Sequence, residues 1–301
     1  MSKELAFFDA DNLPSPKDEA WKYTNMRGVI PEELIEKDIR DVVVHVEKGD
    51  TLKKDLKFEG FDGFEQKIAL SIIVEENAQL ELNETYEGEG AYFQNITTNI
   101  TLHKNARLKH AKRQFESLNS VHINNTYIQQ DKSSNYSNLL MNMGGKISRS
   151  TIQNMMIGEH SECTLYGLNL LEGKQHADTS ICVEHQVPNC KSEQFYRSAL
   201  KDWSVGVFQS KSHVFENAQQ TNARQMSNAL LLSPTATMNT KPELEIYADD
   251  VECSHGATTG QLDDEQLFYL RSRGIPEEQA KDILVEAFIK EVTEKWGVKS
   301  V

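Results

Sequence analysis

A cysteine and a histidine stand two residues apart in a stretch whose pattern is typical of β-strands. Residues 244–248 alternate apolar and polar side chains, and Cys253 and His255 follow shortly after the acidic pair Asp249 and Asp250. If the extended run continues, the thiol and the imidazole point to the same side. A thiolate and an imidazole on one face can bind iron, zinc or a sulfur species. A buried small hydrophobic residue beside a hydrogen-bonded histidine fits the same spacing, and the spacing alone does not separate the two interpretations.

Other residues with chemical potential form weaker patterns. His176 and His185 bound the densest ionisable cluster, but strand alternation places them on opposite faces, which favours a structural role. Cys163, Cys182 and Cys190 are too widely spaced for a local zinc knuckle, so a metal site using them would need distant segments or two chains. Phosphate-loop, Gly-x-Ser-x-Gly and His-Glu-x-x-His motifs are absent from the sequence, and we expect a chain that is not an enzyme and binds no nucleotide.

Composition narrows the classes of partner. The 301 residues include 46 acidic and 32 basic ones, a net charge of −14, which would repel nucleic acid over most of the surface. The first residues lack an apolar run typical of a signal peptide, and no later stretch is apolar enough to span a bilayer. We therefore expect a soluble cytoplasmic protein that binds neither nucleic acid nor membranes.

A repeat predicts how the chain positions the cysteine and histidine. From residue 42 onward β-branched residues, Asn and Thr dominate, which favours strands. Small polar residues recur every 28 residues and open units such as Asn77-Ala78-Gln79-Leu80; these residues are Asn77, Asn105, Ser133, Ser161, Asn189 and Asn217. A fixed period of this size in strand-rich sequence predicts stacked coils, and a parallel β-helix over residues 42–261 fits best. Both ends of such a stack are open edges that need a cover.

The two termini differ from the repeat. Prolines and short helical patterns around Trp21 and Pro31 predict a small helical arm over residues 1–41, suited to cover one end of the stack. Residues 262–301 predict a helical hairpin that breaks at Gly274 and reopens at Pro276. Its apolar stripe fits either an intramolecular contact or a partner-docking surface. The candidate docking residues are Leu267, Phe268, Leu270, Ile283, Leu284 and Phe288.

Several segments together resemble the SufB/SufD family of iron–sulfur cluster assembly scaffolds. The similarity is densest from about residue 173 to residue 296 and thins towards the N-terminus, apart from residues 21–25. The segments that carry it include Gln175-His176, His185-Gln186-Val187-Pro188, Arg197-Ser198-Ala199-Leu200, Asn228-Ala229-Leu230-Leu231-Leu232-Ser233, residues 242–251, Cys253-Ser254-His255-Gly256-Ala257-Thr258 and residues 266–274.

This resemblance implies a right-handed parallel β-helix and a scaffold that builds and transfers iron–sulfur clusters. It implies that the C-terminal helices dock onto a SufC-type ABC ATPase, and that the C-terminal end of the β-helix meets a second SufB/SufD-type subunit. His255, with Cys253 beside it, takes the family's role in building a transient cluster at that interface, and Glu252 and Asp250 are weaker candidate ligands.

The sequence also indicates which branch of the family, SufB or SufD, the chain resembles more. Ala236 stands where SufB carries a functional cysteine, so the chain is most like a short SufD. A minimal SufB-like scaffold that acts as a homodimer with the ATPase is the alternative. A β-helical polysaccharide lyase or hydrolase is the competing class of enzyme, and the sequence offers no obvious carboxylate pair for it.

Overall fold

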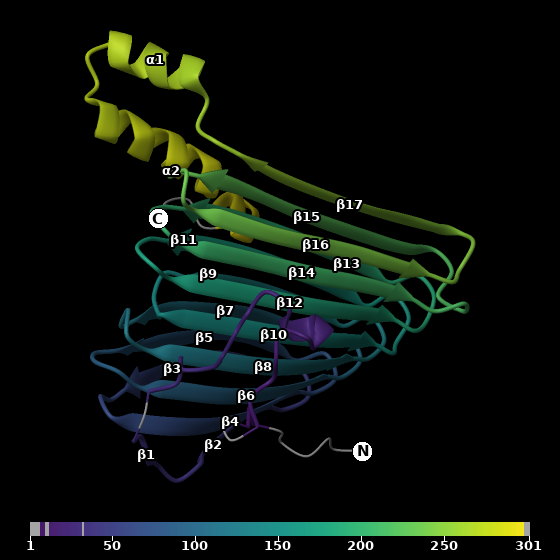
Figure 1. Cartoon of the computed structure of the whole chain (residues 1–301). Coiled ribbons are helices and arrows are strands. Elements are labelled where there is room, and N and C mark those ends of the chain that lie inside the picture. Colours follow the sequence, from purple (N-terminus) through teal and green to yellow (C-terminus); the bar gives the residue numbers. More distant parts are fainter. Residues whose placement is uncertain (1–6, 10–11, 32, 298–301) are drawn as a thin grey trace.

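The chain winds through two parallel β-sheets as a β-solenoid, described here from a computed structural model for residues 7–9, 12–31 and 33–297 (Figure 1). From β2 onward successive strands alternate between the sheets, and each strand pairs in parallel with the strand one full turn away. Sheet A contains β1 (Ile35–Glu36), β2 (Arg40–Val46), β4 (Phe64–Val74), β6 (Phe93–Leu102), β8 (Val121–Gln130), β10 (Ile147–Met156), β12 (His176–His185), β14 (Val205–Val214) and β16 (Thr237–Ile246). Sheet B contains β3 (Thr51–Gly60), β5 (Gln79–Gly88), β7 (Arg107–Glu116), β9 (Asn135–Asn142), β11 (Glu162–Leu171), β13 (Lys191–Leu200), β15 (Thr221–Leu231) and β17 (Val251–Gly260).

The predicted solenoid is confirmed, and its period is strict only in the first turns. Leu80 pairs with Leu108 and Leu108 with Tyr136, each at the predicted spacing. Nearer the C-terminus the turns are longer than 28 residues, as the pairing of Val205 with Thr237 shows. Four of the six small polar residues that open the units adopt left-handed backbone conformations; these are Asn77, Asn105, Ser133 and Asn189, with φ of 61°, 59°, 56° and 62°. At two later corners the left-handed residue is instead His160 or Gln220, so the prediction of an unbroken 28-residue step is wrong there.

The interior combines an apolar core with a buried charged group. Aliphatic side chains of both sheets meet inside the coils, among them Leu70, Ile72 and Leu82. On inward-facing positions of β5 and β7, the carboxylate of Glu84 is fully buried; His110 Nε2 lies 2.7 Å from its Oε1 and Lys112 Nζ lies 3.4 Å from its Oε2. A buried carboxylate is tolerated only with such partners.

The N-terminal arm differs from the two short helices expected around Trp21 and Pro31. Its described residues contain one helical element, a three-residue 3-10 turn at Glu19–Trp21, and Ile35 belongs to strand β1 instead of a helix opened by Pro31. The predicted turn also included Glu32, which lies outside the described residues, as do residues 1–6, 10 and 11 of the arm. Segments this short between prolines cannot nucleate a helix on their own.

The arm lies on the outer face of sheet A and does not cover an end of the solenoid. Trp21 and Met26 pack there against Phe93 and neighbouring apolar residues. The guanidinium of Arg149, only 2% exposed, donates to the carbonyl of Ala20 at 2.7 Å and lies 3.9 Å from the Trp21 ring. The outer face of sheet A carries apolar and charged side chains, and the arm packs on this face and covers them.

The predicted C-terminal hairpin is confirmed. Helix α1 (Asp264–Ser272) starts at Asp263, whose carboxylate accepts the backbone N–H of Glu265 at 2.8 Å. Gly274 allows the turn with a φ of +87°, and helix α2 (Glu277–Trp296) ends at Gly297. Residues 298–301 of the predicted region lie outside the described residues. Within the described part of the chain, neither helix is both long and apolar enough to cross a membrane.

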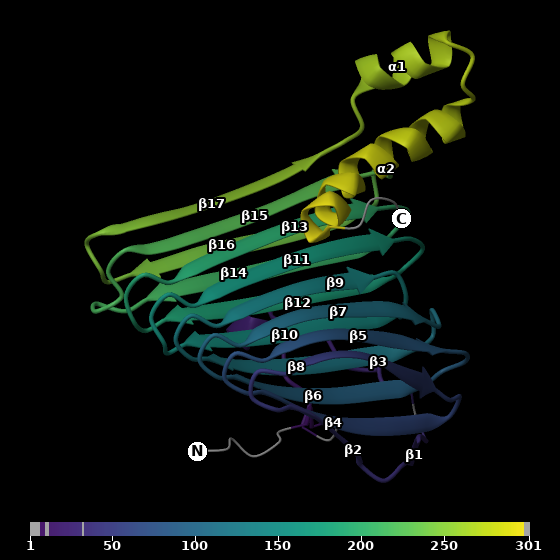
Figure 2. The same ribbon diagram turned by 180° about the vertical axis from the view of Figure 1, so that it is seen from behind.

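The end of α2 fixes the hairpin to the solenoid. Val292 and Trp296 are buried against Leu139, Leu168 and Phe195 on the outer face of sheet B. Helix α1 and the start of α2 project beyond the last coil, as both views show (Figures 1 and 2). The hairpin is therefore anchored at one end and free at the other.

Candidate functional site

The last coil of the solenoid leaves both of its strands with an open edge. Among the described residues β17 pairs with β15 alone, and β16 pairs with β14 alone. The backbone N–H and C=O groups on the outer side of each strand are therefore free to pair with another chain. The stretch predicted to carry chemistry is this terminal strand.

Cys253 and His255 lie on one face of β17, the face that continues the interior of the coils. Cys253 pairs with Ala223 and His255 with Gln225, both of which are buried inward-facing residues of β15. Cys253 packs against an apolar cluster that includes Val214, and burial raises the pKa of its thiol. The imidazole of His255 is exposed at the open end. A thiol that is neutral at pH 7 becomes a good ligand once a metal ion displaces its proton.

The two carboxylates are placed elsewhere. Glu252 faces the opposite side of β17 and accepts a hydrogen bond from the Asn222 side chain at 2.8 Å. Asp250 lies in the preceding turn, where its carboxylate accepts a hydrogen bond from Gln220. Within the described residues no three or more His, Cys, Asp or Glu side chains gather as a metal site. Cys253 and His255 thus share one face of β17, and the carboxylates of Glu252 and Asp250 do not lie on it.

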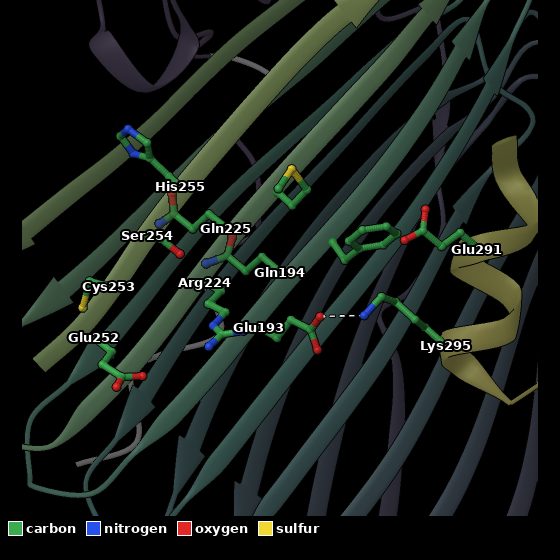
Figure 3. Close-up of a pocket in the computed structure, with 12 residues that line it drawn as sticks. Glu193, Gln194, Arg224, Gln225, Glu252, Cys253, Ser254, His255, Glu291 and Lys295 are labelled. Atoms are coloured by element: carbon green, nitrogen blue, oxygen red, sulfur yellow. Dashed lines mark hydrogen bonds and ion pairs between the residues drawn. The ribbon is translucent and has the colours of Figure 1, made fainter.

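A groove of about 580 Å³ lies behind the terminal strand, between sheet B and helix α2 (Figure 3). Residues 252–255 of β17, which include Cys253 and His255, line one side, and Glu291 and Lys295 of α2 line the other. Lys295 Nζ lies 2.9 Å from a carboxylate oxygen of Glu193, which ties the helix to β13. Helix α2 thus packs on β11 and β13, and the groove separates it from β17.

The predicted docking residues fall into two groups. Phe268 is 73% exposed on α1, and Ile283 is exposed on the projecting part of α2. Leu267, Leu270 and Leu284 are half-buried in the hairpin. Phe288 differs, because its ring lies 4.7 Å from the guanidinium of Arg197 on sheet B and makes an intramolecular contact.

Four other histidines and cysteines singled out in the sequence lie inside the solenoid or beneath the N-terminal arm, and Cys182 is half-buried on β12. His185 is buried inside the solenoid, where its Nε2 lies 2.9 Å from the Ser192 hydroxyl, and His176 faces the arm on the other side of β12. This agrees with the predicted opposite faces. Cys163 and Cys190 are buried thiols, and burial raises the pKa of Cys163 to about 12, so this thiol is inert at neutral pH.

Sequence reasoning missed two residues that bear on function. Tyr269, which is 57% exposed beside Phe268, enlarges the aromatic surface of α1, and its position next to a predicted docking residue was a usable signal. Arg197 carries no local signal of a tertiary role, yet its side chain is only 12% exposed and forms an ion pair with Glu291 of α2. That contact joins positions far apart in the sequence, so no local pattern could have indicated it.

These features define an open-ended parallel β-solenoid with a helical hairpin at the end that carries a cysteine and a histidine. Residues 62–288 match the family model described as the SUF system FeS cluster assembly SufBD core domain. The chain belongs to this family.

Relatives with curated descriptions agree with that assignment. An iron–sulfur cluster assembly SufBD family protein of Synechocystis is 37% identical over 195 residues, covering 65% of this chain and 43% of the relative. The iron–sulfur cluster assembly protein SufD of Escherichia coli is 37% identical over 188 residues, covering 62% and 44%. Protein ABCI7, chloroplastic, of Arabidopsis thaliana is 37% identical over 198 residues, covering 65% and 41%. The matched region spans less than half of each of these relatives.

Proposed function

We propose that the chain is a SufD-like scaffold subunit that builds and transfers iron–sulfur clusters at a subunit interface, driven by a SufC-type ABC ATPase. The cluster is its cargo. The observation that carries the proposal is the pairing of Cys253 and His255 on the open terminal strand. A soft sulfur and a borderline nitrogen donor suit iron, and two ligands from one chain suit a cluster that must later leave.

The two edges of sheet B support association at the C-terminal end. The N-terminal edge strand β3 carries Lys53, Lys54, Asp55, Lys57 and Glu59. Charged edge strands, lysine-rich ones above all, resist pairing with other chains. The stretch from Cys253 to the end of β17 contains no Lys, Arg, Asp or Glu. The second subunit, a SufB-type chain or a second copy, therefore pairs at β17 and supplies the missing ligands.

The projecting hairpin is the proposed docking surface for the ATPase. Exposed Phe268 adjoins a groove of about 500 Å³ that is also lined by Ile275 and Pro276. An apolar surface on a lever that is anchored at Trp296 transmits force to the solenoid when two ATPase subunits close. ATP hydrolysis belongs to the partner, and this chain acts mechanically.

Anaerobic reconstitution with the ATPase tests the cluster site. Iron and sulfide are counted in the wild type, His255→Ala, Cys253→Ser and Ser254→Ala, the last being a control on the opposite face of β17. We expect His255→Ala and Cys253→Ser to lose most of the bound cluster and Ser254→Ala to keep it. Equal loading in all four would refute the assignment of the ligands.

Native mass spectrometry of the purified complex identifies the second subunit. Co-expression with a SufC-type ATPase and a SufB-type chain is expected to give a complex with one copy each of this chain and the SufB-type chain. Two copies of this chain with the ATPase would establish the homodimeric alternative. Phe268→Asp is expected to lower the amount of bound ATPase, and Glu286→Gln, an exposed position on α2, serves as the control.

A further inference from the structure

A row of three side chains connects helix α2 with the terminal strand across the outer face of sheet B. Arg197 of β13 pairs in register with Asn228 of β15, and Asn228 pairs with Thr258 of β17. Strand alternation points all three to the same outer face, on which α2 lies. We call these residues the Arg197 row.

The helix end of the row is held firmly. The Arg197 guanidinium lies 4.9 Å from the ring of Phe195 and 4.7 Å from that of Phe288, and it is ion-paired with Glu291. An arginine flanked by two rings and held by a carboxylate has little rotational freedom. Its orientation therefore follows the position of α2.

At the other end of the row, the side-chain amide of Asn228 forms the hydrogen bonds that reach β17. In the orientation that satisfies all its neighbours, the side-chain oxygen of Asn228 accepts from Arg197 Nη1 at 2.9 Å and from the Thr258 hydroxyl at 3.2 Å. Its nitrogen donates to the carbonyl of Ser227 at 3.2 Å. A single oxygen thus links the arginine that follows α2 to a strand that also carries His255.

A second contact of α2 offers a matched comparison. Lys295 is paired with Glu193 on β13, the same strand that carries Arg197, and both Lys295 and Glu291 face the groove (Figure 3). In the part of the chain that the structure describes, Glu193 is hydrogen-bonded to Tyr166 and Lys295. Arg224 of β15 and Ser254 of β17 are its neighbours in register, but no hydrogen bond or ion pair among the described residues continues the pair to them. Both pairs hold the helix, but one of them alone continues to the terminal strand.

We propose that the Arg197 row couples the position of helix α2 to the terminal strand β17, with Asn228 as the positioning residue that passes the movement on. The inference rests on the proposed function in so far as the force comes from an ATPase docked on the hairpin. When α2 moves, Arg197 turns with it and pulls on or releases Asn228. The hydrogen bond between Asn228 and Thr258 is then strengthened or weakened. The mobility of β17 changes with it, including that of the backbone around His255. Contiguous contacts of this kind carry coupling between sites, and perturbation of single members measures it.

Hydrogen exchange of the β17 amides in the isolated chain tests the coupling without any partner. A hydrogen bond of ordinary strength changes an opening equilibrium by about two- to tenfold. We expect Asn228→Ala and Thr258→Val to speed exchange of β17 by about that factor, and Glu291→Gln to speed it by about twofold. Lys295→Gln is expected to leave β17 unchanged. Equal effects of Glu291→Gln and Lys295→Gln, or no effect of Asn228→Ala, would overturn the proposal.

The complex with the ATPase tests the use of the row. In the wild-type complex, ATP is expected to change the exchange of β17, and in Asn228→Ala this change is lost while the ATPase still binds and hydrolyses ATP. An ATP-dependent change that persists in Asn228→Ala would also overturn the proposal. If the ATPase does not bind the wild-type chain, the proposed function fails, and the comparison of Glu291→Gln with Lys295→Gln in the isolated chain still decides the coupling.

Discussion

The buried carboxylate of Glu84 gives a quantitative test of how the solenoid is held together. Burial by itself raises the pKa of this group, but the charge of Lys112 and the hydrogen bond with His110 outweigh burial and lower the pKa from 4.5 to about 2. For Lys112 itself burial prevails, and its pKa is lowered despite Glu84. The carboxylate is therefore ionised in the folded protein and is the shared partner of two buried groups.

We expect Glu84→Gln to destabilise the protein by about 3–5 kcal/mol, because it leaves the Lys112 ammonium buried without a counter-charge. For a chain of this size that corresponds to a fall in Tm of roughly 5–8 °C. Replacing both groups, as Glu84→Gln with Lys112→Met, removes the unpaired charge and is expected to recover most of the loss. Thermal unfolding followed by circular dichroism at pH 7.5 measures all three.

The control lies three residues away on the other face of the same strand. Glu81 is paired with Lys53 at 2.9 Å, but both side chains are largely exposed, so Glu81→Gln is expected to change stability by less than about 1 kcal/mol. If Glu84→Gln and Glu81→Gln unfold at the same temperature, the network does not contribute as described.

The pH dependence has a defined sign. A carboxyl whose folded-state pKa lies below its ordinary value stabilises the folded protein above pH 4.5, and this contribution is lost as the pH falls from about 4.5 towards 2. A difference of 4.5 to about 2 corresponds to about 3 kcal/mol. In this window the wild type is expected to lose more stability than Glu84→Gln, and parallel losses in the two proteins would contradict the shift.

Three further predictions concern other parts of the molecule. Trp296→Ala removes the buried anchor of α2 and is expected to speed hydrogen exchange of the helix at least tenfold, on the order of the loss of a buried aromatic side chain, whereas Phe268→Ala, at an exposed position, is expected to leave it unchanged. Arg149→Met is expected to release the N-terminal arm, seen as faster chymotryptic cleavage around Trp21; an unchanged cleavage rate would mean that apolar packing alone holds the arm. His185 is expected to stay neutral at pH 5, because burial lowers the pKa of its imidazole to about 4; the folded state then loses stability as the pH falls from 6.5 towards 4, and an NMR titration midpoint near 6.5 would contradict this.

Much of the solenoid was predictable because its signals are local and repeated. A turn residue such as Asn77 sets the backbone at each corner, and the ladder from Leu80 to Tyr136 follows from stacking equal units. The hairpin was predictable for a similar reason, since Asp263 and Gly274 mark helix ends within a few residues. The common face of Cys253 and His255 followed from strand alternation, which also indicates that Glu252 faces away.

The parts that escaped prediction depend on contacts between distant segments. In its described residues the arm has little regular structure, one 3-10 turn and the short strand β1, and it takes its path from the apolar and charged face of sheet A around Arg149. The inward direction of Glu84 and Lys112 requires the phase of each strand, and charged residues in strands are ordinarily assigned to solvent. Arg197 of β13 and Glu291 of α2 are separated in the sequence by two turns of the solenoid and by helix α1, so no local pattern indicates their contact.

The unlike ends of sheet B bear on how large an assembly of such chains can become. A solenoid with two pairing edges would stack head to tail without limit and form filaments, since each added copy would offer a fresh template. In sheet B of this protein the first strand, β3, carries charged side chains that resist pairing. The last strand, β17, has no charged side chain from Cys253 to its end, so its backbone edge can pair. When two such molecules pair through their last strands, the open edge of β17 is occupied in both. No pairing edge of sheet B is then left for a third molecule, and the assembly stops at a dimer.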